Sequence, residues 1–453
     1  MTIATTPLPV EEIHPGELPP GPRLPRMLVT LAWELVPTIL LDRCASRFGE
    51  AFTLYLSDRS FVVVSNPEAV KTLFRAPPEV VPSAAGNSTV APILGPSSVI
   101  TLAGPEHMRQ RKLLLPPFHG ERMHEYEKTI VEATRREMAS WALGTPLRLH
   151  NHTRAITLEV ILRVVFGVEA ERMEELREAM ARLLKPMQVP GVMLLARLRR
   201  PSQRPRGWLG RTLDHLEELI YDELARRREQ SDLEERTDVL SLLLLARDEQ
   251  GRTITDAELR DELVTLLGAG HETTATALAW AIERLVRHPA KLARLIAEID
   301  AGEGDQFMQA VIAETLRVRP VVPLLGRALT EPLRVGAYEL PAGTSVAASI
   351  YLAHRNERVY DGAREFRPER FLGNPPETFT WIPFGGGIRR CIGASFATFE
   401  MKVILRTVLS ELEPELPVRS RWLSRTGERI RPIAVTLAPG GGTLVVWRTR
   451  EPA

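Results

Sequence analysis

The chain has 453 residues, of which 44% are hydrophobic and 25% are charged, as in an ordinary folded globular protein. Its formal net charge of +1 at pH 7 argues against a nucleic-acid binder, whose footprint is a strong basic excess. The two cysteines, Cys44 and Cys391, are far apart in the sequence and indicate no disulfide framework, so we expect a protein of the reducing cytoplasm.

The N-terminal region is predicted to be a proline-rich arm over residues 1–25, followed by one domain over residues 26–453, because no linker divides the rest of the chain. The arm has no basic segment followed by an apolar core, so no signal peptide is predicted. The apolar stretch 27–41 is interrupted by Glu34 and Pro37 and is too short and too polar to span a bilayer. We expect one amphipathic helix there and no stable membrane anchor.

The next segments predict a hairpin and then a mostly helical region. Residues 51–65 alternate, turn and return in a β-branched run, which is typical of a β-hairpin. Asn66 and Pro67 then read as a helix N-cap and first helical residue. From about 105 to 318 the leucine spacing favours helices, and the proline-rich stretch 185–210 is predicted to be a loop between two of them.

The C-terminal part is predicted to contain one long helix, small sheets and a final helix. A helix is expected from Asp256, as N-cap, to about residue 288, where Pro289 stops it. Strands are expected over 333–352, irregular chain over 359–390, a helix over 392–412 and a hairpin over 431–447. The fold class is therefore mainly α with small β-sheets.

One short run, FGGGIRRCIGASFA, surrounds Cys391 with glycines and arginines. A lone cysteine is usually a small buried hydrophobe. Here, three consecutive glycines allow the backbone to approach a flat object closely, and the helix that follows directs its free N–H groups at the sulfur. A helix N-terminus lowers the pKa of a thiol and favours the thiolate.

The partner of that thiolate is not another side chain. No histidine lies close enough in sequence to serve as a base, and no further cysteine or histidine has the spacing of a zinc site. A single thiolate suits a metal whose other ligands come from a cofactor. Haem fits, since a thiolate ligand donates electron density that favours O–O cleavage.

The same run resembles the haem-binding signature F-x-x-G-x-R-x-C-x-G of the cytochrome P450 family, of the soluble bacterial type. The matching positions are Phe384, Gly387, Arg389, Cys391 and Gly393. The resemblance implies haem b (iron protoporphyrin IX), with Cys391 as its metal ligand. It implies that Arg389 pairs with a propionate, and it places Phe384, Gly385 and Gly393 around the cofactor. The implied fold is a single triangular-prism-like domain with a long central helix over the haem.

A second motif lies on the predicted long helix, in LLGAGHETTATALAW over 266–280. The Thr273 hydroxyl can donate to the carbonyl of Ala269, and Gly270 eases a local opening of the helix. The stretch matches the pattern A-G-x-[DE]-T-[TS] of the family. The resemblance places Ala269 and Gly270 at the cofactor and assigns Glu272 and Thr273 to proton delivery to bound dioxygen, which is general acid work. His271 is expected to be a bystander.

A third motif, Glu314 with Arg317, is of the common E-x-x-R type and alone would indicate a surface ion pair. The resemblance implies instead a buried structural network of Glu314, Arg317 and Arg370. It also implies a trimmed loop near 300–309, where the chain is shorter than the usual family connection.

Haem carries two propionates, which need cationic partners. Besides Arg389, the resemblance assigns this role to His107, Arg111 and Arg327. Each of these alone would be read as a solvated surface charge.

The function that the resemblance implies is monooxygenation of a lipophilic small molecule with dioxygen and two external electrons. The predicted pocket residues are Leu266, Val322, Leu324 and Ile430. The electrons are expected from a ferredoxin or flavodoxin with an NAD(P)H-dependent reductase, and the protein is expected to be a monomer. Two alternatives stay open: a peroxide-driven or redox-neutral haem-thiolate enzyme, and a non-catalytic haem sensor or carrier.

Overall fold

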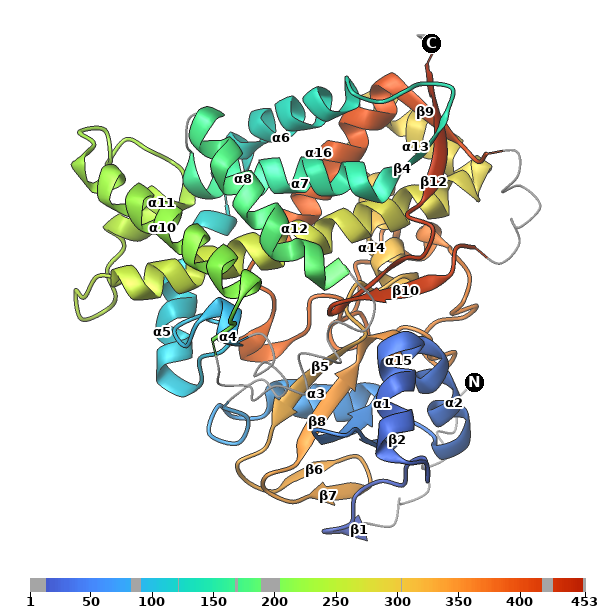
Figure 1. Ribbon diagram of the computed structural model, residues 1–453. Coiled ribbons are helices and arrows are strands. Elements are labelled where there is room, and N and C mark those ends of the chain that lie inside the picture. The colour runs from blue at the N-terminus through green and yellow to red at the C-terminus, as the bar shows by residue number, and fades with distance from the viewer. Residues whose placement is uncertain are drawn as a thin grey trace.

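The computed structural model describes residues 14–82, 91–120, 122–167, 170–188, 204–302, 304–417 and 427–450. Helices fill one end of the molecule, and the four-stranded sheet lies at the other (Figure 1). The helices are α1 (Arg26–Leu35), α2 (Pro37–Phe48), α3 (Pro67–Arg75), α4 (Ala91–Leu94), α5 (Gly104–Leu114), α6 (Arg122–Met138), α7 (Leu149–Phe166), α8 (Ala170–Leu184), α10 (Trp208–Glu229), α11 (Val239–Leu245), α12 (Asp256–Val286), α13 (Pro289–Ala301), α14 (Gln306–Val318), α15 (Ile350–Ala353) and α16 (Ala394–Glu411). The prediction of a mainly helical fold with small sheets is confirmed.

The sheets join strands from distant parts of the chain. The largest has the order β2-β3-β8-β5, and the others are β1-β7-β6, β4-β12-β9 and the hairpin β10-β11. Their strands are β1 (His14–Pro15), β2 (Ala51–Tyr55), β3 (Ser60–Val64), β4 (Pro146–Arg148), β5 (Leu324–Ala328), β6 (Leu333–Val335), β7 (Tyr338–Leu340), β8 (Ser345–Ser349), β9 (Leu412–Glu415), β10 (Ile430–Ile433), β11 (Thr436–Pro439) and β12 (Leu444–Thr449). The predicted N-terminal arm is not wholly separate, because β1 pairs with β7 in parallel.

The single N-terminal helix expected over 27–41 is wrong: two helices, α1 and α2, stand there. The break falls at Val36, which has φ −143° and ψ 53°. Proline excludes the helical conformation from the residue before it, so Pro37 ends one helix and starts the next.

The hairpin and cap that follow are confirmed. β2 and β3 pair antiparallel from Ala51 opposite Val64 to Tyr55 opposite Ser60. The Asn66 side chain accepts hydrogen bonds from two backbone N–H groups of α3, which satisfies donors that a helix start leaves free.

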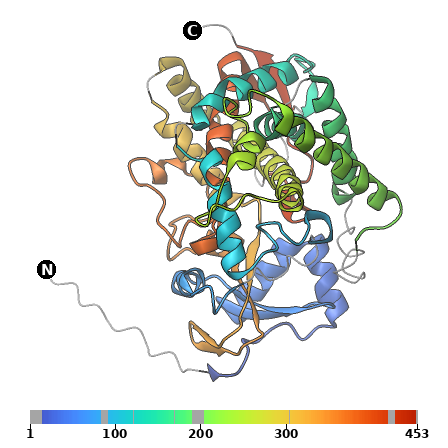
Figure 2. The ribbon, with the colours of Figure 1, turned by 90° about the vertical axis from the view of Figure 1, so that its left-hand side faces the viewer.

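The long helix α12 runs through the middle of the helical layer, as two perpendicular views show (Figures 1 and 2). Its N-cap is Thr255, in a capping box with Glu258, and not Asp256 as expected. It ends at Val286. Because it packs on several sides, most of its residues are buried, and α7 lies along it. The helix is thus the rigid element that positions the second motif.

Other expectations hold in part. The expected loop 185–210 contains a 3₁₀ turn over 185–188, and α10 begins inside it; residues 189–203 lie outside the described part. The end of the expected 333–352 strand region is helical, as α15. The C-terminal hairpin is β10 with β11, whereas β12 joins β4 and β9. The α13–α14 connection is short, as expected. Among the described residues, no helix is long and apolar enough to cross a membrane.

Candidate functional site

The glycine run before Cys391 packs closely against α3 and β5. Gly385 and Gly387 have φ of 70° and 65°, which side chains rarely adopt. A Cβ at Gly386 would lie 2.4 Å from the Phe74 ring, and one at Gly387 would lie 2.0 Å from the Phe74 carbonyl oxygen. A Cβ at Gly385 would lie 2.7 Å from Leu325. The described structure thus requires these glycines for packing against protein, a reason that the sequence did not reveal.

Cys391 itself is fixed by the turn and by the start of α16. Its backbone N–H donates to the carbonyl of Phe384 at 2.9 Å, and the N–H of Gly393, the N-cap of α16, bonds to the sulfur. Cys391 is exposed, yet protein atoms surround it closely enough that burial raises the pKa of its thiol, against the lowering effects of Gly393, Arg390 and Arg111. The helix end lowers the pKa of the thiol as expected, but burial outweighs it. A coordinated metal cation would supply the missing charge, because a coordinating thiol loses its proton outright.

A second accessible strip lies on α12. Ala269 is exposed, and Leu266, Gly270 and Thr273 are half-buried, on a helix whose other residues are mostly buried. The Thr273 hydroxyl donates to the carbonyl of Ala269 at 2.7 Å, as predicted. On the α7 side, Ile161 lies 3.0 Å from where a Cβ of Gly270 would be. A larger residue at 270 would press on α7.

Glu272 is held by a residue that sequence reasoning missed. Nη2 of Arg154, on α7, donates to Oε1 of Glu272 at 2.6 Å. The Thr276 hydroxyl and Nε2 of His150 each lie 3.5 Å from the same oxygen. Burial raises the pKa of Glu272, and Arg154 opposes this. The acid is therefore anchored between two helices, and its side chain is only 16% exposed.

His150 and His271, which lie between α7 and α12, are both buried and neutral. Burial lowers the pKa of His271 to about 3, with a smaller effect from Arg154, and its Nδ1 lies 3.2 Å from the Thr157 hydroxyl oxygen. Burial also lowers the pKa of His150 to about 3. His271, on α12, thus packs against α7 in a structural role, in line with the bystander that the sequence predicts.

The four predicted propionate ligands lie together as three arginines around a neutral histidine. Burial lowers the pKa of His107 to about 4, and Arg389, Arg111 and Arg327 all act on it in the same direction. Burial and the nearby Arg389 lower the pKa of Arg327 to about 10. None of the four forms an ion pair with a carboxylate in the described part of the chain, and Nε of Arg389 is buried with no partner there.

These features together fit a haem group. An exposed cysteine at the start of α16 suits a metal, a cluster of arginines without carboxylate partners suits two propionates, and an accessible strip on α12 suits a flat apolar face. Arg389 donates only to the backbone carbonyls of Pro82 and Leu102. Buried positive charge without an anionic partner is costly, so a dianionic group would stabilise the cluster.

The Glu314 network is assembled as the sequence predicts. Arg317 donates through Nε and Nη2 to the two carboxylate oxygens of Glu314, at 2.7 and 2.8 Å. Nε of Arg370 donates to Glu314 at 3.1 Å. The side chains of Glu314 and Arg317 are fully buried, and Tyr360 lies under both guanidinium groups.

The network reaches the cysteine loop through residues that the sequence did not single out. Arg317 also donates to the carbonyl of His354 at 2.7 Å. The ring Nε2 of His354 accepts from the backbone N–H of Ile382 at 2.8 Å, and Trp381 donates to the carbonyl of Ala313 at 3.0 Å. These bonds tie the loop before Cys391 to α14. No sequence motif marks them, because each partner is backbone.

The predicted pocket residues divide between two apolar clusters. Leu266 and Val322 pack against the helical core, whereas Leu324 and Ile430 pack against the core beneath α1 and α2. All four are half-buried.

A buried acid on α16, Glu400, was also missed. It is 2% exposed, its Oε1 has no partner among the described residues, and Thr274 of α12 bonds to it. Burial raises the pKa of Glu400 to about 8. The sequence could have indicated Glu400, because it is a lone acid on the buried face of an otherwise apolar helix.

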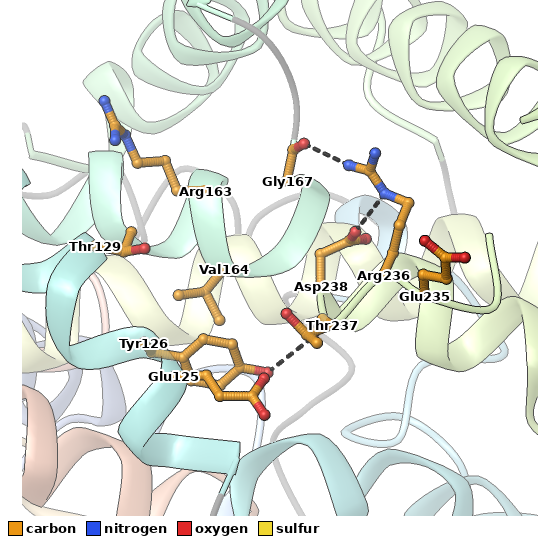
Figure 3. Close-up of a pocket in the computed structure, with 10 residues that line it drawn as sticks. All are labelled: Glu125, Tyr126, Thr129, Arg163, Val164, Gly167, Glu235, Arg236, Thr237 and Asp238. Atoms are coloured by element: carbon orange, nitrogen blue, oxygen red, sulfur yellow. Dashed lines mark hydrogen bonds and ion pairs between the residues drawn. The ribbon is translucent and has the colours of Figure 1, made fainter. Parts of the chain in front are cut away.

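A cavity of about 300 Å³ opens elsewhere, between α6, α7 and the start of α11 (Figure 3). Arg236 spans it, donating to the carbonyl of Gly167 at 2.6 Å and to Asp238 at 2.9 Å. No predicted site residue lines it, so it is separate from the candidate site.

The comparisons with known proteins agree on the family. The family described as Cytochrome P450 matches residues 19–441. Cytochrome P450 135B1 of Mycobacterium tuberculosis (strain ATCC 25618 / H37Rv) is 40% identical over 445 residues, covering 96% of this chain and 92% of the relative. Cytochrome P450 138 of the same strain is 38% identical over 440 residues, covering 96% and 97%.

Solved structures share the fold. Retinoic acid bound cyanobacterial CYP120A1 has a TM-score of 0.81 at 23% identity, covering 96% of this chain and 99% of that one. The haem domain of cytochrome P450DA has a TM-score of 0.82 at 23% identity, covering 97% and 99%. The fold is thus that of haem domains. The chain belongs to the cytochrome P450 family of monooxygenases, which implies a haem cofactor.

Proposed function

We propose that the protein inserts one atom of dioxygen into a C–H or double bond of a lipophilic small molecule, using two externally supplied electrons. The observation that carries this proposal is the acid–alcohol pair on α12: Thr273 lies on the accessible strip, and Glu272, its neighbour in sequence, is held against α7 by Arg154. Bound haem supplies the redox chemistry and the activation of dioxygen. The chain supplies a ligand, cationic anchors, protons and an apolar pocket.

Cys391 would be the metal ligand, and its position is set by α16 and by the backbone bond to Phe384. Arg389, Arg327, Arg111 and His107 would hold the propionates. Besides burial, the positive charges of the three arginines lower the pKa of His107, which supports this assignment, because two carboxylates would offset that charge.

Proton supply would run through Glu272 and Thr273. Burial raises the pKa of Glu272, so its carboxyl holds a proton at higher pH than an ordinary glutamic acid does. Arg154 fixes the carboxylate on the α7 side. The Thr273 hydroxyl, now bonded to Ala269, can rotate to pass a hydrogen on. These two groups therefore act as a positioned general acid pair.

The substrate is proposed to be lipophilic, because the predicted lining residues are apolar: Leu266, Val322, Leu324 and Ile430. Hydrophobic lining with few polar groups is typical of sites for such ligands.

An acidic redox protein, a ferredoxin or flavodoxin with its NAD(P)H-dependent reductase, is proposed as the electron donor in the cytoplasm, acting on a monomer. Arg390, beside Cys391, is exposed and supports this. Lys112, a second exposed cation, pairs with Glu249 at 2.6 Å, so the proposed contact with the electron donor rests mainly on Arg390. Complementary charge steers association and weakens with salt.

The test is oxygen labelling. Lipophilic compounds that shift the Soret band of the holoprotein are incubated with ferredoxin, reductase, NADPH and ¹⁸O₂. One labelled oxygen atom per product is expected, and Thr273→Ala is expected to divert electrons to hydrogen peroxide. Thr134→Ala, which removes the same kind of bond to the carbonyl four residues back on α6, is the control. Product that forms with peroxide alone, unaffected by Thr273→Ala, would favour the peroxide-driven alternative. Ligand binding without any oxidation would favour a sensor.

A further inference from the structure

Exposed large apolar side chains gather at the start of the chain. Eleven such side chains occur on the described surface, and six of them lie within residues 24–39. They are Leu24, Met27, Leu28, Leu35, Val36 and Ile39. Leu24, Leu28 and Leu35 are each more than half exposed, at 55%, 51% and 53%. Isolated apolar residues on a surface are normal, but a cluster of this kind marks an interaction site.

The exposure is not explained by poor packing of α1. The inner face of that helix is occupied: Val29 is fully buried, and Trp33 stacks edge-on against Phe61 with ring centroids 5.8 Å apart. Leu28 and Leu35, seven residues apart, share the opposite face, because seven residues are close to two helical turns. A helix with apolar side chains on both faces is stable in water only when both faces are buried against another surface.

The charges around this apolar face have one sign. On α2, Ile39, Arg43 and Arg47 follow at four-residue spacing on the exposed side. Arg23 and Arg26 are exposed beside the start of α1. None of these four arginines forms an ion pair with a described residue.

The acidic residues of the same stretch are less exposed than those arginines. Glu34 and Asp42 are both half-buried. Asp42 accepts a hydrogen bond from the Tyr351 hydroxyl at 2.9 Å, and so points into the protein. The outer surface of α1 and α2 therefore combines apolar side chains with uncompensated positive charge. Figures 1 and 2 show the two helices at one outer edge of the molecule.

We propose that α1 and α2 dock on an anionic lipid bilayer. The apolar side chains would enter the boundary between head groups and acyl chains, and the arginines would contact lipid phosphates. The binding is peripheral and reversible, since no described helix can cross a membrane. It goes beyond the proposed oxidation and does not depend on it.

A bilayer fits this face better than a protein partner does. Specific protein interfaces are anchored by Trp, Tyr and Arg in shaped pockets. Here the exposed side chains are aliphatic or Met, the aromatic Trp33 faces inward, and the cavities beside Arg236 and beside Met308 do not include them. Leucine-rich faces flanked by basic residues are typical of helices that lie in a membrane interface.

The test uses the full-length holoprotein in a sedimentation assay with two vesicle preparations. One contains phosphatidylcholine alone, and the other contains phosphatidylcholine with phosphatidylglycerol. The protein is expected to pellet with the anionic vesicles and to be released in part by salt. The double variant Leu28→Glu, Leu35→Glu should abolish this. Arg43→Gln with Arg47→Gln should weaken partitioning by about fivefold for each charge removed. Leu143→Glu, at a site 44% exposed elsewhere on the surface, is the matched control and should bind normally.

Unchanged haem absorbance and circular dichroism show that each variant is folded. The proposal is overturned if the wild type stays in solution with both vesicles, or if Leu143→Glu loses binding as fully as the double variant. Equal binding to both vesicle types would overturn the role of the arginines. A concentration-dependent dimer that the Leu28→Glu, Leu35→Glu variant abolishes would show that a second copy covers the face instead.

Discussion

Arg154 on α7 and Glu272 on α12 are joined by a 2.6 Å hydrogen bond between Nη2 and Oε1, although 118 residues separate them. The bond sets where the acid of the acid–alcohol pair stands and how strongly it holds a proton. Burial raises the pKa of Glu272 and Arg154 lowers it, so the arginine limits the shift.

The first prediction follows for Arg154→Gln. Without the guanidinium, burial acts alone and the pKa of Glu272 rises further. The carboxyl then stays protonated to higher pH, so the alkaline limb of the turnover profile should move to higher pH. The measurement is product formed per electron consumed as a function of pH.

Arg163→Gln is the control for this change. Arg163 is also on α7 but pairs with Glu159 and Glu132 near the surface, so its loss should leave the profile in place. The account of Arg154 is contradicted if its substitution does not move the alkaline limb, or if Arg163→Gln moves it equally.

The second prediction concerns Arg327, a buried cation without a carboxylate partner in the described structure. Arg327→Leu should stabilise the apoprotein, because a buried uncompensated charge is removed. The same substitution should weaken haem retention, because a propionate loses its partner. A charged hydrogen bond contributes about 1.5–3 kcal/mol. Thermal denaturation of apo and holo forms measures both effects, and Arg334→Leu, at an exposed position on β6, is the control. Changes of the same sign in both forms would refute the assignment.

The third prediction uses Glu400 and pH. Its pKa is raised to about 8 from 4.5, so the folded protein keeps a proton that the unfolded chain has released. The contribution of the Glu400 carboxyl to the free energy of unfolding is therefore fully present below pH 4.5. It falls as pH rises and is lost by about pH 8. Glu400→Gln is neutral at every pH and should remove this loss. The variant should match the wild type near pH 4.5 and melt at higher temperature near pH 8.

Urea denaturation at the two pH values measures this difference. Glu413→Gln, an exposed acid on β9, should show no such pH-dependent gain. A Glu400→Gln variant that is less stable than the wild type at pH 8 would show that Glu400 is ionised and paired.

The fourth prediction is that Glu314→Ala yields misfolded protein without haem. Its carboxylate accepts from Arg317, from Arg370 and from the backbone N–H of Arg367. Breaking a buried ion pair by removing one partner costs about 3–5 kcal/mol. Soluble fraction and haem content measure the outcome. Glu369→Ala breaks the partly exposed pair with Lys291 and should cost about 0–1 kcal/mol. Normal haem content in soluble Glu314→Ala would rule out the structural role.

The features that the sequence predicts best are those carried by residues close together in the chain. The Thr273 bond to Ala269 is four residues long and follows from helix geometry. The Asn66 cap is equally local. The break between α1 and α2 was also predictable, because Pro37 constrains the backbone of Val36. The apolar pattern of residues 27–41 nevertheless favoured a single helix.

The features that could not be predicted depend on contacts between distant segments. No motif marks Arg154 on α7 or His354 at the end of α15, and only the packing of α7 against α12 and of His354 against the chain at Ile382 gives them partners. The glycines before Cys391 suggested room for a cofactor, whereas Phe74, more than 300 residues earlier, accounts for two of them. The thiol pKa was predicted in the wrong direction because burial, which outweighs the helix end, is not visible in a sequence.

The central claim is that Cys391 is the metal ligand of a bound haem, and its most direct test is the absorbance of the reduced, carbon monoxide-bound holoprotein. We expect this form of the protein to show a Soret band with the red shift typical of thiolate ligation. We also expect loss of this band in Cys391→Ala but not in Cys44→Ala, since Cys44 is buried in the core beneath α2. A wild-type spectrum without the red shift, or a Cys391→Ala variant that keeps it, would contradict the account.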